Sequence, residues 1–194
     1  FVFGIQATPV KYVFEKAKKT GIDVFPIACV TKGMKGQELC DYDALKAAGV
    51  TAISDDGRPV ENAELMRQAI EKTNENGLIV TSHCEDLKII NGGIINKGDI
   101  SEKLGVKGMD RASEDYITAR EICLAMSCNA RVHICHVSTK GSVNIIRAAK
   151  KDGVKVTCET APHYFTFTDE KLLARDADFR MSPPLRTEEC GAWS

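Results

Sequence analysis

The sequence predicts an α/β fold built around a parallel β-sheet. Five short apolar runs, rich in β-branched residues, are separated by segments with helical periodicity. The runs follow one another at roughly 25-residue intervals, apart from one longer connection, as expected of βαβ units. Neither G-x-G-x-x-G nor G-x-x-x-x-G-K-[ST] follows any run, so nothing indicates a nucleotide site. The pattern is typical of part of a (β/α)-barrel or of a doubly wound fold.

Strands and helices are expected to alternate along the chain. We expect strands at 23–31, 51–54, 78–82, 131–137 and 154–159. We expect helices at 10–19, 41–48, from about 59 to 74, 113–128 and 141–151. Gly21, Gly49 and Gly77 follow the first three helices, as is common where a helix ends. Residues 86–110, rich in Gly and Lys, are expected to form a long loop, and loops of that length are usually functional.

The composition describes an ordinary soluble protein. Hydrophobic residues make up 43% of the chain, and 26 basic residues nearly balance 27 acidic ones, which gives no sign of a nucleic-acid or membrane partner. The eight cysteines include no C-x-x-C pair, which favours reduced thiols inside the cell. No apolar run approaches the ~18 residues that a membrane span needs. We therefore expect a cytoplasmic protein.

Three successive strands are each expected to end in a potential metal ligand: Asp56, His83 and His136. The carboxyl ends of parallel strands in a barrel lie on one face, so ligands far apart in sequence can converge there. Two imidazoles and a carboxylate suit Zn²⁺ and similar ions, and an open coordination position would hold a reactive water. Each residue also has an ordinary structural interpretation: a turn at Asp55-Asp56-Gly57, and buried histidines bonded to backbone.

Strand alternation distinguishes the two histidines of the segment A-R-V-H-I-C-H-V-S-T-K at 130–140. Side chains two residues apart share a face of a strand. His136 therefore shares a face with Val132 and Ile134, whereas His133 lies on the other face. We expect His136 to be the ligand and His133 to be structural. The same argument allows only one of Asp55 and Asp56 to be a ligand.

Several short motifs together resemble dihydroorotase, of the class in the amidohydrolase superfamily found in many bacteria. They are V-T-K-G at 30–33, S-D-D-G at 54–57, H-C-E at 83–85, H-V-S-T-K-G-S-V at 136–143, A-P-H at 161–163 and P-P-L-R at 183–186. The resemblance implies a partial (β/α)₈ TIM-type barrel containing roughly strands 3 to 7 with their helices. It implies interconversion of N-carbamoyl-L-aspartate and dihydroorotate, with one or two Zn²⁺ ions per site held in part by Asp56, His83 and His136.

Parts of the family's site have no counterpart in this sequence. The H-x-H of strand one and the strand-eight aspartate that would shuttle the proton are missing, so no catalytic residue is assigned. Because the chain lacks an initial Met and ends in E-E-C-G-A-W-S, we expect residues 1–194 to be the central part of one hydrolase domain, inactive when expressed alone. Ser182 stands where many relatives have a substrate-contacting asparagine and is the candidate substrate-binding residue.

Two alternatives to dihydroorotase are a hydantoinase- or dihydropyrimidinase-like enzyme and a non-catalytic homologue that assembles with another pyrimidine-pathway enzyme. Hydantoinases usually carry a carbamylated lysine where this chain has Asp55-Asp56, which favours dihydroorotase. The expected partners are a small-molecule substrate and possible copies of the chain or a pathway enzyme. Arg186 is expected either to steady the P-P-L-R loop or to lie near an anionic substrate, and Glu114 to make a surface or interhelix contact.

Overall fold

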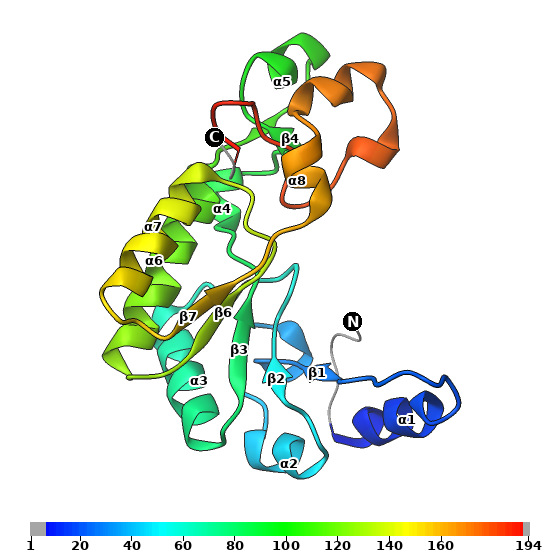
Figure 1. Ribbon diagram of the computed structural model, residues 1–194, viewed down its shortest axis with the longest axis vertical. Coiled ribbons are helices and arrows are strands. Elements are labelled where there is room, and N and C mark those ends of the chain that lie inside the picture. Colours follow the sequence, from blue (N-terminus) through cyan, green and yellow to red (C-terminus); the bar gives the residue numbers. More distant parts are fainter. Residues whose placement is uncertain (1–6, 192–194) are drawn as a thin grey trace. The chain divides into compact units, whose positions relative to one another are not determined.

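The computed structural model describes residues 7–191, which divide into two compact units (Figure 1). The first unit contains residues 7–83 and 123–133, and the second contains 84–122 and 134–191. The chain therefore crosses between the units three times: after His83, within a helix and within a strand. No helix among the described residues combines the length and the apolar character needed to cross a membrane.

The first unit is built on parallel strands joined by helices. Its elements are α1 (Ala7–Ala17), β1 (Ile27–Ala28), the 3₁₀ turn η1 (Lys32–Met34), α2 (Tyr42–Ala47), β2 (Ala52–Ile53), α3 (Ala63–Glu75) and β3 (Ile79–Ser82). Strand β2 pairs in parallel with both of its neighbours, Ile27 lying opposite Ala52 and Ile53 opposite Val80. Ile53, Val80 and Ile70 of α3 have no exposed surface, so the sheet and its helices enclose an apolar core.

Side-chain caps fix where the helices of the first unit begin. The Asp41 carboxylate accepts a hydrogen bond from the Ala44 N–H at the start of α2. The Asn62 side chain accepts from the N–H groups of Glu64 and Leu65, so α3 begins at Ala63 rather than near residue 59 as predicted. Such caps satisfy backbone donors that have no partner within the first helical turn.

The second unit contains more regular structure than predicted. Its elements are α4 (Leu87–Ile90), β4 (Ile95–Asn96), α5 (Asp99–Leu104), β5 (Gly108–Met109), most of α6 (Ala112–Ser127), the end of β6 (Val132–Ile134), α7 (Lys140–Lys151), β7 (Val156–Cys158), α8 (Pro162–Thr166) and the 3₁₀ turns η2 (Asp169–Ala174) and η3 (Ala177–Phe179). The prediction of one long loop at 86–110 is thus wrong. Strands β4 and β5 pair in parallel, and Ile95, Ile100 and Leu172 form a small core beside them.

A glycine makes the close pairing of β4 and β5 possible. A Cβ atom on Gly108 would lie 2.4 Å from the Lys97 Cα, and one on Gly93 would lie 2.4 Å from the Gly108 carbonyl oxygen. These separations are far below van der Waals contact. Gly93 and Gly108 therefore allow tight backbone packing, whereas Gly92, Gly98 and Gly105 have open space around them and positive φ angles.

The main sheet has the strand order β1-β2-β3-β6-β7. At its second-unit end, the Val137 N–H donates to the Glu159 carbonyl and the Glu159 N–H donates to the Ile134 carbonyl. The five strands are those predicted, although each is shorter than expected. The predicted α/β class with a parallel sheet is confirmed.

Candidate metal site

Asp56 and His83 lie together at the carboxyl ends of two neighbouring parallel strands. His83 directly follows β3, and Asp56 comes three residues after β2. The His83 Nδ1 and the Asp56 Oδ1 are 2.9 Å apart, and the His83 side chain is buried. Parallel pairing of β2 with β3 places both strand ends at one edge of the sheet, as the sequence predicted for these two residues.

Asp55, the neighbour of Asp56, has a separate structural role. Its carboxylate accepts hydrogen bonds from the Val30 N–H at 2.8 Å and from the Thr31 N–H at 3.2 Å. The Thr31 hydroxyl donates to the same carboxylate. Burial raises the pKa of Asp55, and these hydrogen bonds oppose that change. The donors at the end of β1 occupy the Asp55 oxygens. That Asp56 is the metal ligand of the two aspartates stays a prediction.

His136 lies beyond the end of its strand. Strand β6 ends at Ile134, so the predicted strand 131–137 extends too far. His136 has a φ of 38°, in the left-handed region that few non-glycine residues occupy. Strand alternation therefore does not apply at this position, although it was the basis for choosing His136 over His133. His136 belongs to the second unit and Asp56 and His83 to the first, so convergence of the three side chains stays a prediction.

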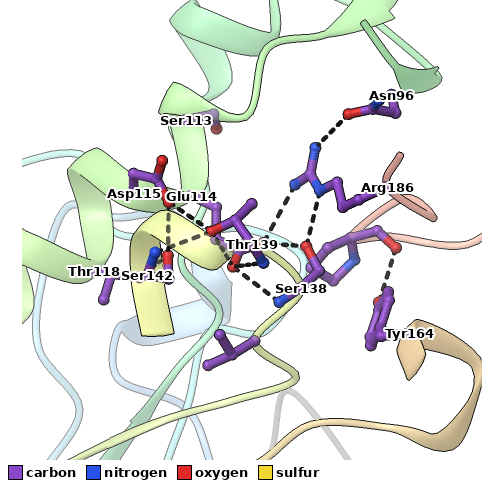
Figure 2. Close-up of polar contacts among 12 residues, drawn as sticks. Asn96, Ser113, Glu114, Asp115, Thr118, Ser138, Thr139, Ser142, Tyr164 and Arg186 are labelled. Atoms are coloured by element: carbon purple, nitrogen blue, oxygen red, sulfur yellow. Dashed lines mark hydrogen bonds and ion pairs between the residues drawn. The ribbon is translucent and has the colours of Figure 1, made fainter. Parts of the chain in front are cut away.

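The segment after His136 is held by buried polar side chains (Figure 2). The Glu114 carboxylate accepts hydrogen bonds from the N–H groups of Ser138, at 2.9 Å, and Thr139, at 3.0 Å. Glu114 is only 4% exposed, so the surface alternative of the prediction is wrong. Its bonds to Thr139, the residue that caps α7, fit the interhelix alternative. The sequence offered one signal for a buried role of Glu114. Two hydroxyl residues, Ser138 and Thr139, follow the strand after its helix and could donate to a carboxylate.

Arg186 of the P-P-L-R segment is an internal residue. Its guanidinium donates to the Ser138 Oγ at 3.0 Å, the Asn96 Oδ1 at 3.1 Å and the Glu114 Oε2 at 3.2 Å. Arg186 is 5% exposed. Of the two expected roles, the contacts support the structural one. Ser182, by contrast, is exposed at the start of this segment, and its role toward a substrate stays a prediction.

Comparison with known protein families assigns the chain. A family model described as dihydro-orotase-like matches residues 9–142, more than half of the sequence. The chain belongs to the dihydroorotase-like family. Membership agrees with the resemblance seen in the motifs at Asp56, His83 and His136.

Named dihydroorotases are similar to this family member over nearly its whole length. The chain is 52% identical over 177 residues to a dihydroorotase of Citrifermentans bemidjiense, and 50% identical over 179 residues to one of Geobacter metallireducens. These alignments include 91% and 92% of the chain but only 42% of each relative. The chain thus spans less than half the length of the relatives that it matches.

Solved structures similar to this family member include proteins named as dihydropyrimidinases and hydantoinases. A dihydropyrimidinase from Brevibacillus agri superposes with a TM-score of 0.73 at 20% identity, with 96% of this chain and 43% of that one aligned. An L-hydantoinase from Arthrobacter aurescens gives 0.69 at 17% identity, with 93% and 42% aligned. At such identity the likeness concerns the fold alone. It confirms the predicted partial barrel.

Proposed function

We propose that the intact protein is a dihydroorotase, which interconverts N-carbamoyl-L-aspartate and dihydroorotate in pyrimidine biosynthesis. The observation that carries this proposal is identity of about one half to named dihydroorotases across more than nine-tenths of the chain. The substrate is then a small cyclic amide bearing a carboxylate. Asp56 and His83 bring together a carboxylate and an imidazole, the ligand types that would hold a metal ion to activate the water for its hydrolysis.

The residues fit a divalent metal ion. Two ligand atoms bound ~2.0–2.2 Å from one ion lie about 3.3–3.6 Å apart in the tetrahedral geometry typical of Zn²⁺. The His83 Nδ1 and the Asp56 Oδ1 are 2.9 Å apart, a hydrogen-bond distance, so a small outward shift would bring both atoms onto one ion. Asp56, His83 and His136 would hold the metal, for which imidazole and carboxylate ligands favour Zn²⁺, one or two ions per site. When bound, the metal would lower the pKa of a coordinated water toward about 7.

The chain's own residues support the site in two ways. Asp55 ties the end of β1 to the segment that carries Asp56, through bonds to Val30 and Thr31. His83 is buried, so its imidazole is largely shielded from water and can face in few directions. Both effects reduce the motion of potential ligands before a metal binds, which is the usual function of outer contacts around metal sites.

The two alternatives have weaker support. A hydantoinase-like enzyme would be expected to carry lysine after β2, where Asp55 and Asp56 stand, and the hydantoinase structures share 17–22% identity with the chain. A non-catalytic homologue commonly loses metal ligands, whereas all three candidates are present here. A cytoplasmic location, and assembly with copies of itself or with another pyrimidine-pathway enzyme, belong to the same proposal.

The experiment that tests the proposal uses the intact protein containing this chain. Metal content and the ring opening of dihydroorotate, hydantoin and dihydrouracil would be measured on one purified sample. We expect bound metal and preference for dihydroorotate. The variants Asp56→Ala and His83→Ala should lose metal and turnover together, whereas Asp43→Ala, an exposed aspartate of α2, should retain both. Preference for hydantoin, or full metal content in both site variants, would overturn the proposal.

A further inference from the structure

His136 is held in a backbone conformation that needs external support. Its φ of 38° lies in the left-handed region, which costs energy for a residue with a Cβ atom. Such a conformation persists only where the surrounding structure fixes the neighbouring residues. The next three residues, Val137, Ser138 and Thr139, are all buried, and each of their N–H groups has a hydrogen-bond partner.

Glu114 supplies most of that support. Its carboxylate accepts two backbone N–H bonds, from Ser138 and Thr139, and two hydroxyl bonds from the same residues (Figure 2). The Ser138 and Thr139 side chains are completely buried. One carboxylate of α6 thus fixes both residues through main chain and side chain, beginning two positions after His136.

Arg186 supplies the counter-charge for Glu114. A buried carboxylate is costly unless a cation or several donors face it. The Arg186 Nη2 lies 3.2 Å from the Glu114 Oε2, and its Nε donates to the Ser138 Oγ. The remaining side of the guanidinium faces Asn96, whose amide donates to the Asp169 carboxylate at 2.9 Å. Arg186 therefore joins β4, η2 and the P-P-L-R segment to the segment after His136.

The start of α7 is fixed from the same helix. The Asp115 Oδ1 accepts from the Ser142 hydroxyl at 3.0 Å, and it shares the single proton of the Thr139 hydroxyl with the Glu114 carboxylate. Thr139 in turn caps α7 by accepting from the Ser142 N–H. A Cβ atom on Gly141 would lie 2.3 Å from the Asp115 Oδ2, so helix α7 can approach α6 this closely only with glycine there.

From these contacts we infer that Glu114 and Arg186 are positioning residues for His136. They act through Ser138 and Thr139 to hold the imidazole in the direction in which it binds metal. The inference rests on the proposed function, because it takes His136 to be a ligand. It predicts that disturbing Glu114 changes metal binding by more than the accompanying loss of stability explains.

The decisive comparison is Glu114→Gln against Ile146→Ala in the intact protein. Glutamine keeps the shape of Glu114 but removes its charge and turns an amide N–H₂ toward the Arg186 guanidinium or the Ser138 and Thr139 donors. Ile146 is a buried apolar residue of α7, the helix that follows Ser138 and Thr139, so its truncation destabilises that helix without removing any of the polar contacts. Zn²⁺ affinity would be measured by competition with a chelator, the spectrum of bound Co²⁺ recorded, and thermal unfolding followed without metal.

We expect Glu114→Gln to weaken Zn²⁺ binding by about 10–100-fold and to alter the Co²⁺ spectrum, as loss of an outer partner of a ligand usually does. Ile146→Ala should change Zn²⁺ affinity by less than about threefold, even if it lowers the unfolding temperature as much as Glu114→Gln does. The apolar contacts of Ile146 affect stability, whereas the polar contacts of Glu114 affect Zn²⁺ affinity as well. The double variant Glu114→Gln/Arg186→Met should bind Zn²⁺ more tightly than Arg186→Met alone, because that single change leaves the Glu114 charge buried without its cation.

The outcomes separate this inference from the proposed function. If Glu114→Gln and Ile146→Ala affect Zn²⁺ affinity equally, Glu114 is merely structural and the inference is wrong, whereas the proposed function stands. If His136→Ala retains full Zn²⁺ affinity, the assignment of His136 as a ligand fails and the inference fails with it. Should Glu114→Gln not fold, Ser138→Ala, which removes one hydroxyl, allows the same comparison. An unchanged Co²⁺ spectrum in Ser138→Ala would then refute the inference.

Discussion

The Asp55 carboxylate accepts a hydrogen bond of 2.8 Å from the backbone N–H of Val30, at the end of the neighbouring strand. Glu114 makes the equivalent contact with Ser138 at 2.9 Å, after β6. In both places the strand end continues as Thr-Lys-Gly, and the threonine donates its N–H and its hydroxyl to the same carboxylate. Two strand ends, one in each unit, are thus fixed by the same arrangement of a buried carboxylate and a threonine.

The first prediction concerns the stability provided by Asp55. Asp55→Ala would leave the buried N–H groups of Val30 and Thr31 without their acceptor. Each unsatisfied buried donor costs about 1–3 kcal/mol, so the free energy of unfolding should fall by about 2–5 kcal/mol. Urea unfolding of the intact protein measures this loss.

Asp41→Ala is the matched control for Asp55→Ala. Asp41 also accepts a backbone N–H bond, from Ala44 at 3.0 Å, but it is exposed at the start of α2. Loss of such a cap costs about 1 kcal/mol, because water can replace the lost acceptor. Equal losses from the two variants would show that the Asp55 contacts contribute no more than an ordinary helix cap.

The second prediction tests the choice between two histidines. His136→Ala should remove a metal ligand and lower turnover of dihydroorotate by more than about 100-fold, beyond the range found for outer-shell partners. His133→Ala should have a much smaller effect, because His133 lies within β6, before the strand end. Turnover and metal content of both variants would be measured in the intact protein. Equal losses would show that His136 is the wrong choice.

The candidate ligands could be predicted because they depend on regular structure. Parallel strands place their carboxyl ends together, so Asp56 and His83 could be paired from strand positions alone. For His136 the position was predictable but the direction was not. Its φ is left-handed, and the segment that follows it contacts residues as distant in sequence as Arg186, 48 positions after Ser138. Periodicity within one strand contains no information about such contacts.

The segment 86–110 shows a different limit of the sequence. Strands of two residues, such as β4 and β5, are too short to display a period, and their glycines are typical of loops. The segment is structured because Ile95 and Ile100 pack on Leu172, more than 70 residues away, and because Asn96 bonds to Asp169. Tertiary contacts of this kind override local propensity, which is why the loop predicted from composition is wrong.

The third prediction concerns the pH dependence of stability at Asp169. Burial raises the pKa of Asp169 above its ordinary value of 3.8, nearby Glu170 adds to the increase, and Asn96 and Arg186 oppose it. The unfolded state keeps the ordinary pKa of 3.8, and the folded state has the raised one. Between these two values the folded state binds more protons than the unfolded state, so stability falls as pH rises. Asp169→Asn removes this effect. Relative to the variant, wild type should lose up to about 1.4 kcal/mol per pH unit from pH 3.8 up to the raised pKa of the folded state, and no more beyond it.

Urea unfolding of wild type and Asp169→Asn at about four pH values between pH 4 and pH 7 would measure how the difference in their free energies of unfolding changes with pH. Asp178→Asn is the control, since Asp178 is an exposed aspartate of η3. Its difference from wild type should be nearly constant across the same range. A constant difference for Asp169→Asn as well would mean that the Asp169 carboxylate titrates alike in the folded and unfolded states.

The last prediction concerns Ser182 and substrate binding. Ser182 is exposed, whereas the next four residues are buried, and the Tyr164 hydroxyl donates to the Pro183 carbonyl at 2.8 Å. The backbone at Ser182 is therefore held by a buried segment while its own side chain is exposed. Ser182→Asn should accordingly alter the free energy of unfolding by less than about 0.5 kcal/mol.

In relatives that have asparagine at this position, the longer amide side chain would reach a substrate carboxylate that the Ser182 hydroxyl does not reach. A hydrogen bond to a charged group contributes about 1.5–3 kcal/mol, so the KM for dihydroorotate should fall by about tenfold or more with kcat little changed. Steady-state kinetics of wild type, Ser182→Asn and Ser182→Ala in the intact protein measure this, with the alanine variant expected to resemble wild type. A large rise in KM for Ser182→Ala would instead show that the serine hydroxyl already contacts the substrate.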